Sequence, residues 1–433
     1  MSVTGRRRWT IVGAALLAAG AAAACSSSSA HPPATGAIVA TMPALSAPPS
    51  RPVPSRSTRP SPRPTPPAPS PIYRLPADAL LVGPGHKYAK PCQAIAAAKP
   101  GATIGIDAKG NGTYNGDVCA WSTDRLTIAG FNGMAHIDAA GRNAQGKATW
   151  VIAGDRTTIR DVELSGSAVP DHNGAGIRQE GAGLTVIGCY FHDNQDGILA
   201  GDNPGSDIVV EDSEFARNGA GDGYSHNMYV NHVRSFTLEG SWSHDARIGH
   251  LVKSRALVNH ILYNRITGQG GTDSYEIDLP NGGLSDVIGN VIEQGKATQN
   301  PAMLSYGEEG SLNPHSRLYV IGNTFVNDLG HGPSVAVGSA VNEPVTVLDN
   351  VSVGSSTLVS QAGAVSHGNC VTANPRFARA ASYDYRLAAG SPCLNVGVPP
   401  GSGLTPTREY AQPTSTRSRP TIGRLDAGAL ECG

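Results

Sequence analysis

The sequence is poor in several features that would mark common classes of protein. Only six of its 433 residues are Phe and four are Trp, and no long stretch has the 3.6-residue apolar period of a helix. The formal net charge of −1 argues against a nucleic-acid-binding protein, which usually presents a basic surface. No CxxC pair occurs, which argues against zinc binding and thiol redox chemistry. The sequence is therefore not that of a helical, nucleic-acid-binding or thiol-redox protein.

What the chain does contain is a ragged repeat of short β-rich phrases, such as "LTVIGCYFHDN", "FTLEGSWSHDA" and "LYVIGNTFVND". The residues aligned at one turn position of the repeat are Asp161, Cys189, Ser213, Ser241, Asn264, Asn290, Asn323 and Asn350. Their spacing of 23–33 residues indicates stacked units that bury apolar faces against their neighbours. We expect an all-β, right-handed parallel β-helix, with the asparagines satisfying backbone groups at the turns. Two other repeat architectures fit less well. The repeats lack the leucine spacing of leucine-rich repeats, and they are shorter than propeller blades, which run to ~40–45 residues.

The first 25 residues resemble a bacterial lipoprotein signal. Basic "GRRRW" precedes the apolar "TIVGAALLAAGAAAA" and Cys25, and this run is shorter than the ~20 residues of a membrane span. We expect export, with lipidation at Cys25 or plain secretion as the two outcomes, because Ala22 replaces the usual Leu. The route, Sec or twin-arginine, stays open. Any membrane contact is expected only through a lipid on Cys25.

Two further segments complete the predicted organisation. Residues 26–72 are rich in Pro, Ser, Ala and Thr, a composition that predicts an extended spacer without a core. Residues 73–433 are expected to form the β-helix domain, and we expect this domain to be a monomer. A solenoid can exceed the usual domain length of ~100–200 residues because its core is a line.

Six cysteines follow Cys25, and export makes disulfides expected among them. Cys92 and Cys119 flank the first coil, so we predict that they are bridged. Cys370–Cys393, near the other end, is the second choice. Such bridges would staple the two ends of the solenoid, although six cysteines allow 15 pairings and the sequence alone does not fix the connectivity.

Two segments resemble secreted proteins of the pectate-lyase-like β-helix group. "LLVGPGHKYAKPCQAIAAAKPGATIGI" resembles their opening segment, in which a short helix, here "CQAIAAA", caps the first coil. "NPRF…DYRLAAGSPCLNVG…DAGALE" resembles their closing segment. With the repeats, the resemblance covers residues 80–433 and implies the fold. It does not imply an activity, because this fold carries lyases, hydrolases, epimerases and adhesins.

Chemically useful residues gather in four successive phrases, "SHNMYVNHV", "SHDARIGHLVKSR", "SYEIDLPNGG" and "LSYGEEG". Strand alternation predicts that Glu276 and Asp278 face outward, while Tyr275 shares the core face. Tyr229 and Lys253 are also expected to face outward. Because strands of successive coils lie ~4.8 Å apart, these outward groups would line one groove.

The phrase "HLVKSRALVNHILYNRITGQGG" resembles the "VKS…N" coil of chondroitinase B and the related alginate lyases of polysaccharide lyase family six. In that family the matching lysine removes the proton beside the uronic carboxylate, so the resemblance implies that Lys253 is the base. The family's arginine has no counterpart in "SYEIDLPNGG", and only Asp245 matches its calcium-binding acids. The four phrases together resemble a functionally unassigned group of bacterial β-helix proteins.

We therefore predict an exported protein that acts on an acidic polysaccharide or cell-envelope glycan, as a lyase or epimerase-like enzyme. The predicted catalytic residues are Lys253, Arg255, His250, Glu276 and Asp278. The predicted substrate-binding residues are His226, Asn227, Tyr229 and Arg247. Arg255 or Arg247 would neutralise the substrate carboxylate.

Two alternatives remain open at this point. The first is a non-catalytic protein that binds carbohydrate or the cell envelope. The second is a glycoside hydrolase that uses Glu276 and Asp278 as its two carboxylates. The same pair could instead hold Ca²⁺, the one candidate cofactor, or could form ion pairs with Lys253 or Arg255.

Overall fold

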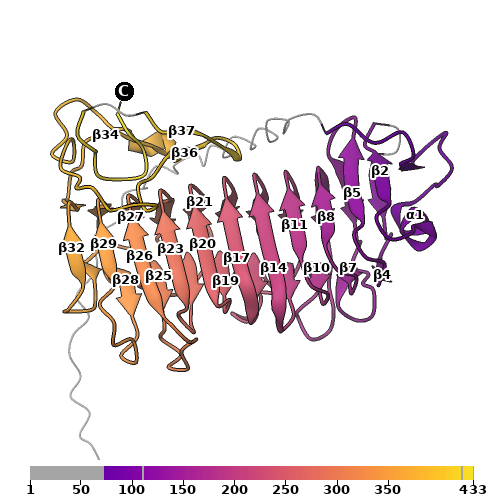
Figure 1. Ribbon diagram of the computed structural model, residues 1–433, viewed down its shortest axis with the longest axis horizontal. Helices are drawn as coiled ribbons and strands as arrows, with labels where there is room; N and C mark the ends of the chain where they lie inside the picture. The colour runs from indigo at the N-terminus through magenta and orange to yellow at the C-terminus, as the bar shows by residue number, and fades with distance from the viewer. Residues whose placement is uncertain (1–72, 110–111, 421–422, 433) are drawn as a thin grey trace, which may run out of the picture. The chain divides into compact units, whose positions relative to one another are not determined.

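The structure is a computed structural model that describes residues 73–109, 112–420 and 423–432. The predicted signal segment, Cys25 and the spacer 26–72 lie outside the described residues. The described part of the chain is almost entirely β, and its strands stack in three long parallel sheets (Figure 1). Each coil adds one strand to each sheet for about ten coils, which confirms the predicted right-handed parallel β-helix. In the part that the structure describes, no helix has the length and apolarity needed to cross a membrane.

We refer to the three sheets as A, B and C. Sheet A consists of β1 (Leu80–Val82), β2 (Thr103–Asp107), β5 (Thr127–Phe131), β8 (Thr157–Arg160), β11 (Leu184–Ile187), β14 (Asn203–Glu211), β17 (Val233–Glu239), β20 (Val258–Leu262), β23 (Leu284–Ile288), β26 (Arg317–Ile321), β29 (Thr346–Leu348) and β32 (Val365–His367). Sheet B consists of β3 (Thr113–Asn115), β6 (Ala135–Asp138), β9 (Val162–Ser165), β12 (Tyr190–His192), β15 (Glu214–Ala216), β18 (Trp242–His244), β21 (Arg265–Thr267), β24 (Val291–Gln294), β27 (Thr324–Asn327), β30 (Val351–Val353) and β33 (Cys370–Val371). Sheet C consists of β4 (Cys119–Trp121), β7 (Ala148–Ile152), β10 (Ala175–Gln179), β13 (Asp196–Ala200), β16 (Met228–Val230), β19 (Val252–Ser254), β22 (Ile277–Leu279), β25 (Leu304–Tyr306), β28 (Pro333–Val337) and β31 (Thr357–Val359).

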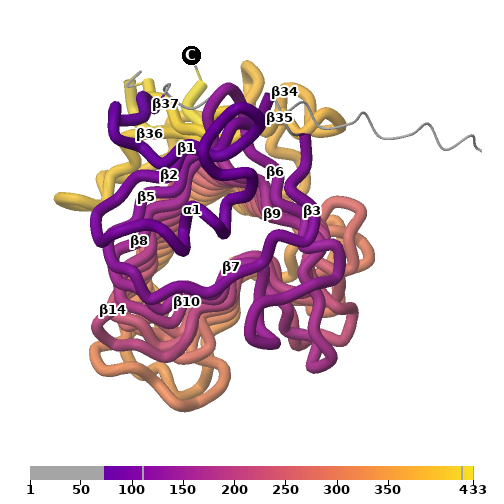
Figure 2. The backbone as a smooth tube through the Cα atoms, turned by 90° about the vertical axis from the view of Figure 1, so that its right-hand side faces the viewer, coloured from indigo at the N-terminus to yellow at the C-terminus, as the bar shows by residue number. Residues whose placement is uncertain are grey.

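The three sheets enclose the interior of the solenoid, as the view along the coils shows (Figure 2). A line of stacked apolar side chains fills this interior and forms the core. One inward column of sheet A consists of Ile128, Ile159, Val186, Val210, Leu238, Ile261, Val287, Val320 and Val347. Every member of the column is at most 1% exposed. Burial of one such side chain is worth about 1.5–3 kcal/mol, so each coil contributes to stability only when its neighbours are in place.

The turn position predicted from the repeats forms a ladder of hydrogen bonds. Each backbone N–H donates to the side-chain oxygen one coil on, at 2.9–3.1 Å. The ladder runs through Cys189, Ser213, Ser241, Asn264, Asn290, Asn323, Asn350 and Asn369. Asp161 is one residue out of register, because Val162 is the counterpart of Cys189. Asp161 instead takes the preceding left-handed position, with φ 54°, where the next coil has Gly188.

The N-terminal end of the solenoid is closed by α1 (Pro91–Ala97), the predicted capping helix. Ala94 and Ile95 of this helix are buried against the first coils, and the helix lies across the near end of the coils in Figure 2. The predicted disulfide Cys92–Cys119 is confirmed and joins α1 to β4.

The C-terminal end differs from the prediction that coils continue to residue 433. After β33 the chain, which no longer carries the repeat phrases, forms two antiparallel hairpins. Their elements are β34 (Phe377–Arg379), η1 (Ala380–Ser382), β35 (Asp384–Leu387), β36 (Arg408–Ala411) and β37 (Ser415–Ser418). This C-terminal segment, yellow in Figure 1, folds back along the coils. The Thr407 N–H donates to Tyr263 Oη at 3.3 Å, and the Ala429 N–H donates to Thr324 Oγ1 at 3.0 Å.

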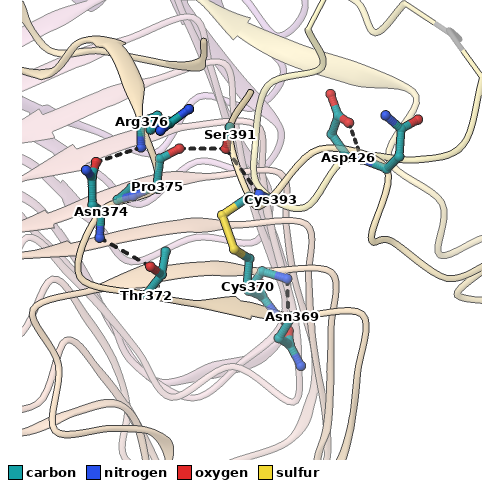
Figure 3. The surroundings of a disulfide bond; sticks show 11 residues. Asn369, Cys370, Thr372, Asn374, Pro375, Arg376, Ser391, Cys393 and Asp426 are labelled. Atoms are coloured by element: carbon teal, nitrogen blue, oxygen red, sulfur yellow. Dashed lines mark hydrogen bonds between the residues drawn. A yellow bond between two sulfur atoms is a disulfide. The ribbon is translucent and has the colours of Figure 1, made fainter. Parts of the chain in front are cut away.

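The second predicted disulfide, Cys370–Cys393, is also confirmed and ties the C-terminal segment to the last strand of sheet B (Figure 3). Ser391 supports it, because its hydroxyl donates to the carbonyl of Pro375 and accepts from the Cys393 N–H. Among the described cysteines, Cys189 and Cys432 form no disulfide. Two disulfides in the described chain are consistent with an extracellular protein.

Candidate functional site

The middle coils of sheet C carry a column of outward-facing polar side chains. Tyr229 of β16 pairs in register with Lys253 of β19, and Lys253 pairs with Asp278 of β22. The residue before each of them in the chain is fully buried in the core, because side chains alternate between the two faces of a strand. The structure therefore gives these three residues the outward orientation that we expected.

Lys253 lies between two carboxylates. Its Nζ is 3.2 Å from Asp278 Oδ2 and 3.5 Å from Glu309 Oε1, and it lies 5.6 Å from the centre of the Tyr229 ring. Burial raises the pKa of Asp278, although the positive charge of Lys253 opposes that rise. Only 12% of the Lys253 side chain is exposed, against 46% for Glu309. Glu309 is therefore the carboxylate that a ligand can reach.

Arg255 lies beside Lys253 and shares two of its neighbours. Its Nε donates to Tyr229 Oη at 2.9 Å, and its Nη2 donates to Glu309 Oε1 at 2.9 Å. Its Nη1 donates to Asn281 Oδ1 at 2.5 Å. Burial works against the charged form of Arg255, but the hydrogen bonds to Glu309 and Tyr229 outweigh it and raise the pKa. The hydrogen bond between Arg255 and Glu309 also holds the pKa of Glu309 below its usual range. Two cations thus converge on one exposed carboxylate.

His250 and His226 stack one coil apart beneath this pair, with ring centres 4.6 Å apart. The His250 N–H donates to His226 Nδ1 at 3.0 Å, and the Tyr275 N–H donates to His250 Nδ1 at 3.3 Å. Both rings therefore carry their hydrogen on Nε2. The Nε2 atom of His250 lies 3.4 Å from Asp278 Oδ2. Burial, and then the charges of Lys253 and Arg255, lower the pKa of His250 to about 3. His250 is accordingly neutral, and because its Nδ1 already accepts the Tyr275 N–H it is not placed to act as a general base. We call Tyr229, His250, Lys253, Arg255, Asp278 and Glu309 the sheet C cluster.

Glu276 does not join the sheet C cluster, contrary to the predicted alternation. Strand β22 begins only at Ile277, so the two-residue period does not extend back to Glu276. The Glu276 side chain is fully buried, and burial together with the neighbouring Asp273 raises its pKa well above the usual value. Glu276 and Asp278 therefore have different neighbours, and the predicted pairing of these two residues around Ca²⁺ or around a glycosidic bond is not formed.

Three other residues lie elsewhere than predicted. Asn227 is fully buried, and its amide is hydrogen-bonded to neighbouring turns of the solenoid. Arg247 pairs with Asp193 at 2.5 Å, away from the sheet C cluster. Tyr275 is not a core residue, because its ring lies 5.2 Å from that of His250 and its hydroxyl reaches a loop carboxylate. The short strand explains this last difference as well.

Glu309 and Asn281 were not among the predicted site residues. Both lie in loops that follow strands of sheet C, β25 and β22. The alternation rule applies only within strands, so it could not place them. The available signal was positional, because a residue just after a strand in one coil lies near the equivalent position of the next coil.

The match to a family model agrees with this architecture. Residues 126–292 match the model of the right-handed β-helix region, a stretch that includes the whole sheet C cluster except Glu309. No curated protein is significantly similar in sequence.

Similar solved structures were found as well. The crystal structure of pectate lyase Pel9A superposes with a TM-score of 0.53 at 18% identity, over 79% of this chain and 90% of that chain. A pectin methylesterase from Aspergillus niger gives a TM-score of 0.27 at 13% identity, over 70% of this chain and 88% of that chain. The chain therefore has the pectate-lyase-like right-handed β-helix fold.

Proposed function

We propose that the protein is an exported enzyme that acts on an acidic polysaccharide, with the sheet C cluster as its active site. The observation that carries the proposal is the convergence of Lys253 and Arg255 on the exposed Glu309. A carboxylate of the substrate can replace that of Glu309 at Arg255, which would place the adjacent carbon of a uronic acid beside Lys253. Lipidation at Cys25, the Sec or twin-arginine route and the monomeric state stay predictions.

The proposed reaction is a β-elimination at the uronic acid. Arg255 neutralises the carboxylate, so that the proton on the adjacent carbon becomes more acidic. Lys253, in its neutral form, accepts this proton. The electrons of the broken C–H bond form a C=C bond, and the glycosidic C–O bond breaks with its electrons on oxygen. Tyr229 accepts a hydrogen bond from Arg255, which leaves its own O–H free to protonate the departing oxygen.

One alternative has its own support. The cluster's cations are already paired with Asp278 and Glu309, an arrangement that also suits a binding protein that exchanges one carboxylate for another. A glycoside hydrolase loses its support, because Glu276 is fully buried beside Asp273 and Glu293, whereas Asp278 lies beside Lys253.

The full chain incubated with a panel of uronate polysaccharides separates these functions. New ultraviolet absorbance from unsaturated uronates supports the lyase. Reducing ends without that absorbance indicate hydrolysis. Retention on the polysaccharide without products indicates binding, and neither products nor retention on any uronate polymer contradicts the proposal.

A further inference from the structure

A separate group of side chains that could bind a metal ion lies on the outer face of sheet B, in coils nearer the N-terminus. His136 of β6 pairs in register with Glu163 of β9. His192 lies on β12, the next strand, where Tyr190 is the register partner of Glu163. His192 therefore reaches back diagonally toward Glu163. Three successive coils each contribute one side chain to this group, which we call the sheet B triad.

The ligand atoms of the sheet B triad lie close together. His192 Nε2 is 2.8 Å from Glu163 Oε1, and His136 Nε2 is 3.7 Å from the same oxygen. All three ligand atoms lie within 4.8 Å of one another. In a tetrahedral zinc site with bonds of about 2.0–2.1 Å, ligand atoms are ~3.3 Å apart. Small side-chain rotations would bring the three atoms to that spacing.

The second nitrogen of each ring is already engaged, which orients the rings. His192 Nδ1 lies 2.8 Å from Asp193 Oδ2, and Arg217 in turn donates to that carboxylate at 2.8 Å. His136 Nδ1 lies 3.0 Å from Thr113 Oγ1. Metal-binding histidines are commonly held through their other nitrogen by a carboxylate or another oxygen. In the sheet B triad this arrangement leaves the His192 Nε2 on Glu163. The His136 Nε2 lies between Glu163 and the hydroxyl of Ser165, which is 2.8 Å away and which a bound ion would displace.

The donor set indicates which ion would bind. Two imidazoles and one carboxylate suit Zn²⁺ and similar transition metals better than Ca²⁺ or Mg²⁺, which prefer oxygen. The side chains of His136, Glu163 and His192 are 25%, 26% and 15% exposed, so an ion can enter from solvent. The absence of CxxC pairs excludes only zinc sites built from such cysteines, whereas the ligands of the sheet B triad come from three separate coils.

We propose that His136, Glu163 and His192 form a binding site for a divalent transition-metal ion of the Zn²⁺ class. Three protein ligands leave one position of the ion open to water or to an anionic oxygen. The ion joins three successive coils, so binding stabilises the N-terminal part of the solenoid. The site lies on sheet B and is independent of the function proposed for sheet C.

The test is a calorimetric titration of the metal-stripped full chain with ZnCl₂, followed by Co²⁺ for its visible spectrum. We expect one site, a rise in Tm on Zn²⁺ addition, and a Co²⁺ spectrum of low coordination number. Glu163→Gln and His192→Ala should each weaken binding by roughly 100-fold or more. Asp193→Asn leaves the three ligands in place but removes the carboxylate charge that orients His192 and pairs with Arg217 and Arg247, and it should weaken binding by about 10–100-fold.

The matched control is His172→Ala, which removes another histidine paired with a carboxylate, Asp222, at 2.9 Å. Its Zn²⁺ affinity should equal that of the unmodified chain. The proposal is wrong if the unmodified chain fails to bind Zn²⁺, or if Glu163→Gln binds it equally well. Glu163→Gln keeps the size of the side chain and an oxygen that can accept the hydrogen bond from His192, so it serves as the decisive variant even where His192→Ala does not fold.

Discussion

Charged side chains gather on the outer faces of both sheet B and sheet C, but one group in the later coils of sheet B is covered, whereas the group on sheet C stays accessible. The sheet B residues are Glu214, His244, Arg265 and Glu293, which we call the covered cluster. They are 3–6% exposed because the C-terminal segment lies over them. For example, the Arg265 guanidinium lies 4.6 Å from the Trp242 ring and 4.8 Å from that of Tyr383 in this segment. In the sheet C cluster, by contrast, 46% of Glu309 is exposed.

This difference shows that burial and ion pairing on a β-helix do not by themselves mark an active site. The His244–Glu214 contact, at 3.1 Å, is as short as the Lys253–Asp278 contact of the sheet C cluster, at 3.2 Å. It is closed to a polysaccharide, however, and it connects strands under the C-terminal segment. Solvent exposure distinguishes an active-site role from a structural role. We therefore expect substitutions in the sheet C cluster to change activity and substitutions in the covered cluster to change stability.

The largest expected effect is on activity, from Lys253→Met. The substitution keeps the apolar stem and removes the amine that accepts the proton. We expect turnover to fall by roughly 10²–10⁴-fold, the usual loss for a general base. Initial rates of unsaturated product formation, on a substrate that the unmodified chain cleaves, measure it.

Lys147→Met is the matched control, because Lys147 also forms an ion pair, with Glu180 at 2.5 Å, elsewhere on the solenoid. It should leave turnover unchanged. Full activity of Lys253→Met would show that Lys253 is only a structural cation, and the binding-protein alternative would then be preferred.

The next effect is on stability, from Arg265→Ala in the covered cluster. The substitution removes a buried guanidinium that stacks between Trp242 and Tyr383. We expect the free energy of unfolding to fall by about 2–4 kcal/mol, with turnover retained. Urea unfolding and initial rates measure the two quantities. Loss of activity without loss of stability would contradict the assignment of this cluster to structure.

A smaller and pH-dependent effect is expected from Glu293→Gln. Burial, and then the nearby Asp328, raise the pKa of Glu293 from 4.5 to about 7. A carboxyl whose pKa is higher in the folded state stabilises the fold at low pH and loses that contribution as the pH rises through the folded-state value. Glu293→Gln should therefore be more stable than the unmodified chain at pH 8, by about 1–3 kcal/mol. At pH 4 the difference should vanish. Unfolding at both values checks it, and a difference independent of pH would mean that Glu293 does not titrate in this range.

The repeats were sufficient to predict the coils, because one apolar residue and one turn residue recur in every coil. The ladder from Cys189 to Asn350 was predicted in this way. The positions of Tyr229, Lys253 and Asp278 followed from the same regularity, since each lies inside a strand with buried neighbours. Regular sequence thus predicts regular structure well.

The rest could not be predicted, because it depends on where strands begin and on loops. Glu276 was misplaced by the start of β22 at Ile277, and Glu309 belongs to a loop that approaches Arg255 across 54 positions of sequence. The C-terminal segment, which decides that the covered cluster is closed, carries no repeat phrase at all. No local pattern reports which outer face such a segment will cover.

The smallest expected effect comes from Glu309→Gln, and it tests how the sheet C cluster receives its substrate. Glu309 occupies the position that we assign to a substrate carboxylate, so it competes with the substrate for Arg255. Removing its charge should lower KM by about 2–5-fold, the range of a single exposed ion pair, and the gain should shrink at high salt. Glu308→Gln removes the same charge one residue away, where the carboxylate contacts Tyr275 and not Arg255, and should change KM less. A higher KM in Glu309→Gln would contradict this competition. It would mean that Glu309 contacts the substrate itself, or that its charge holds Arg255 and Lys253 in position.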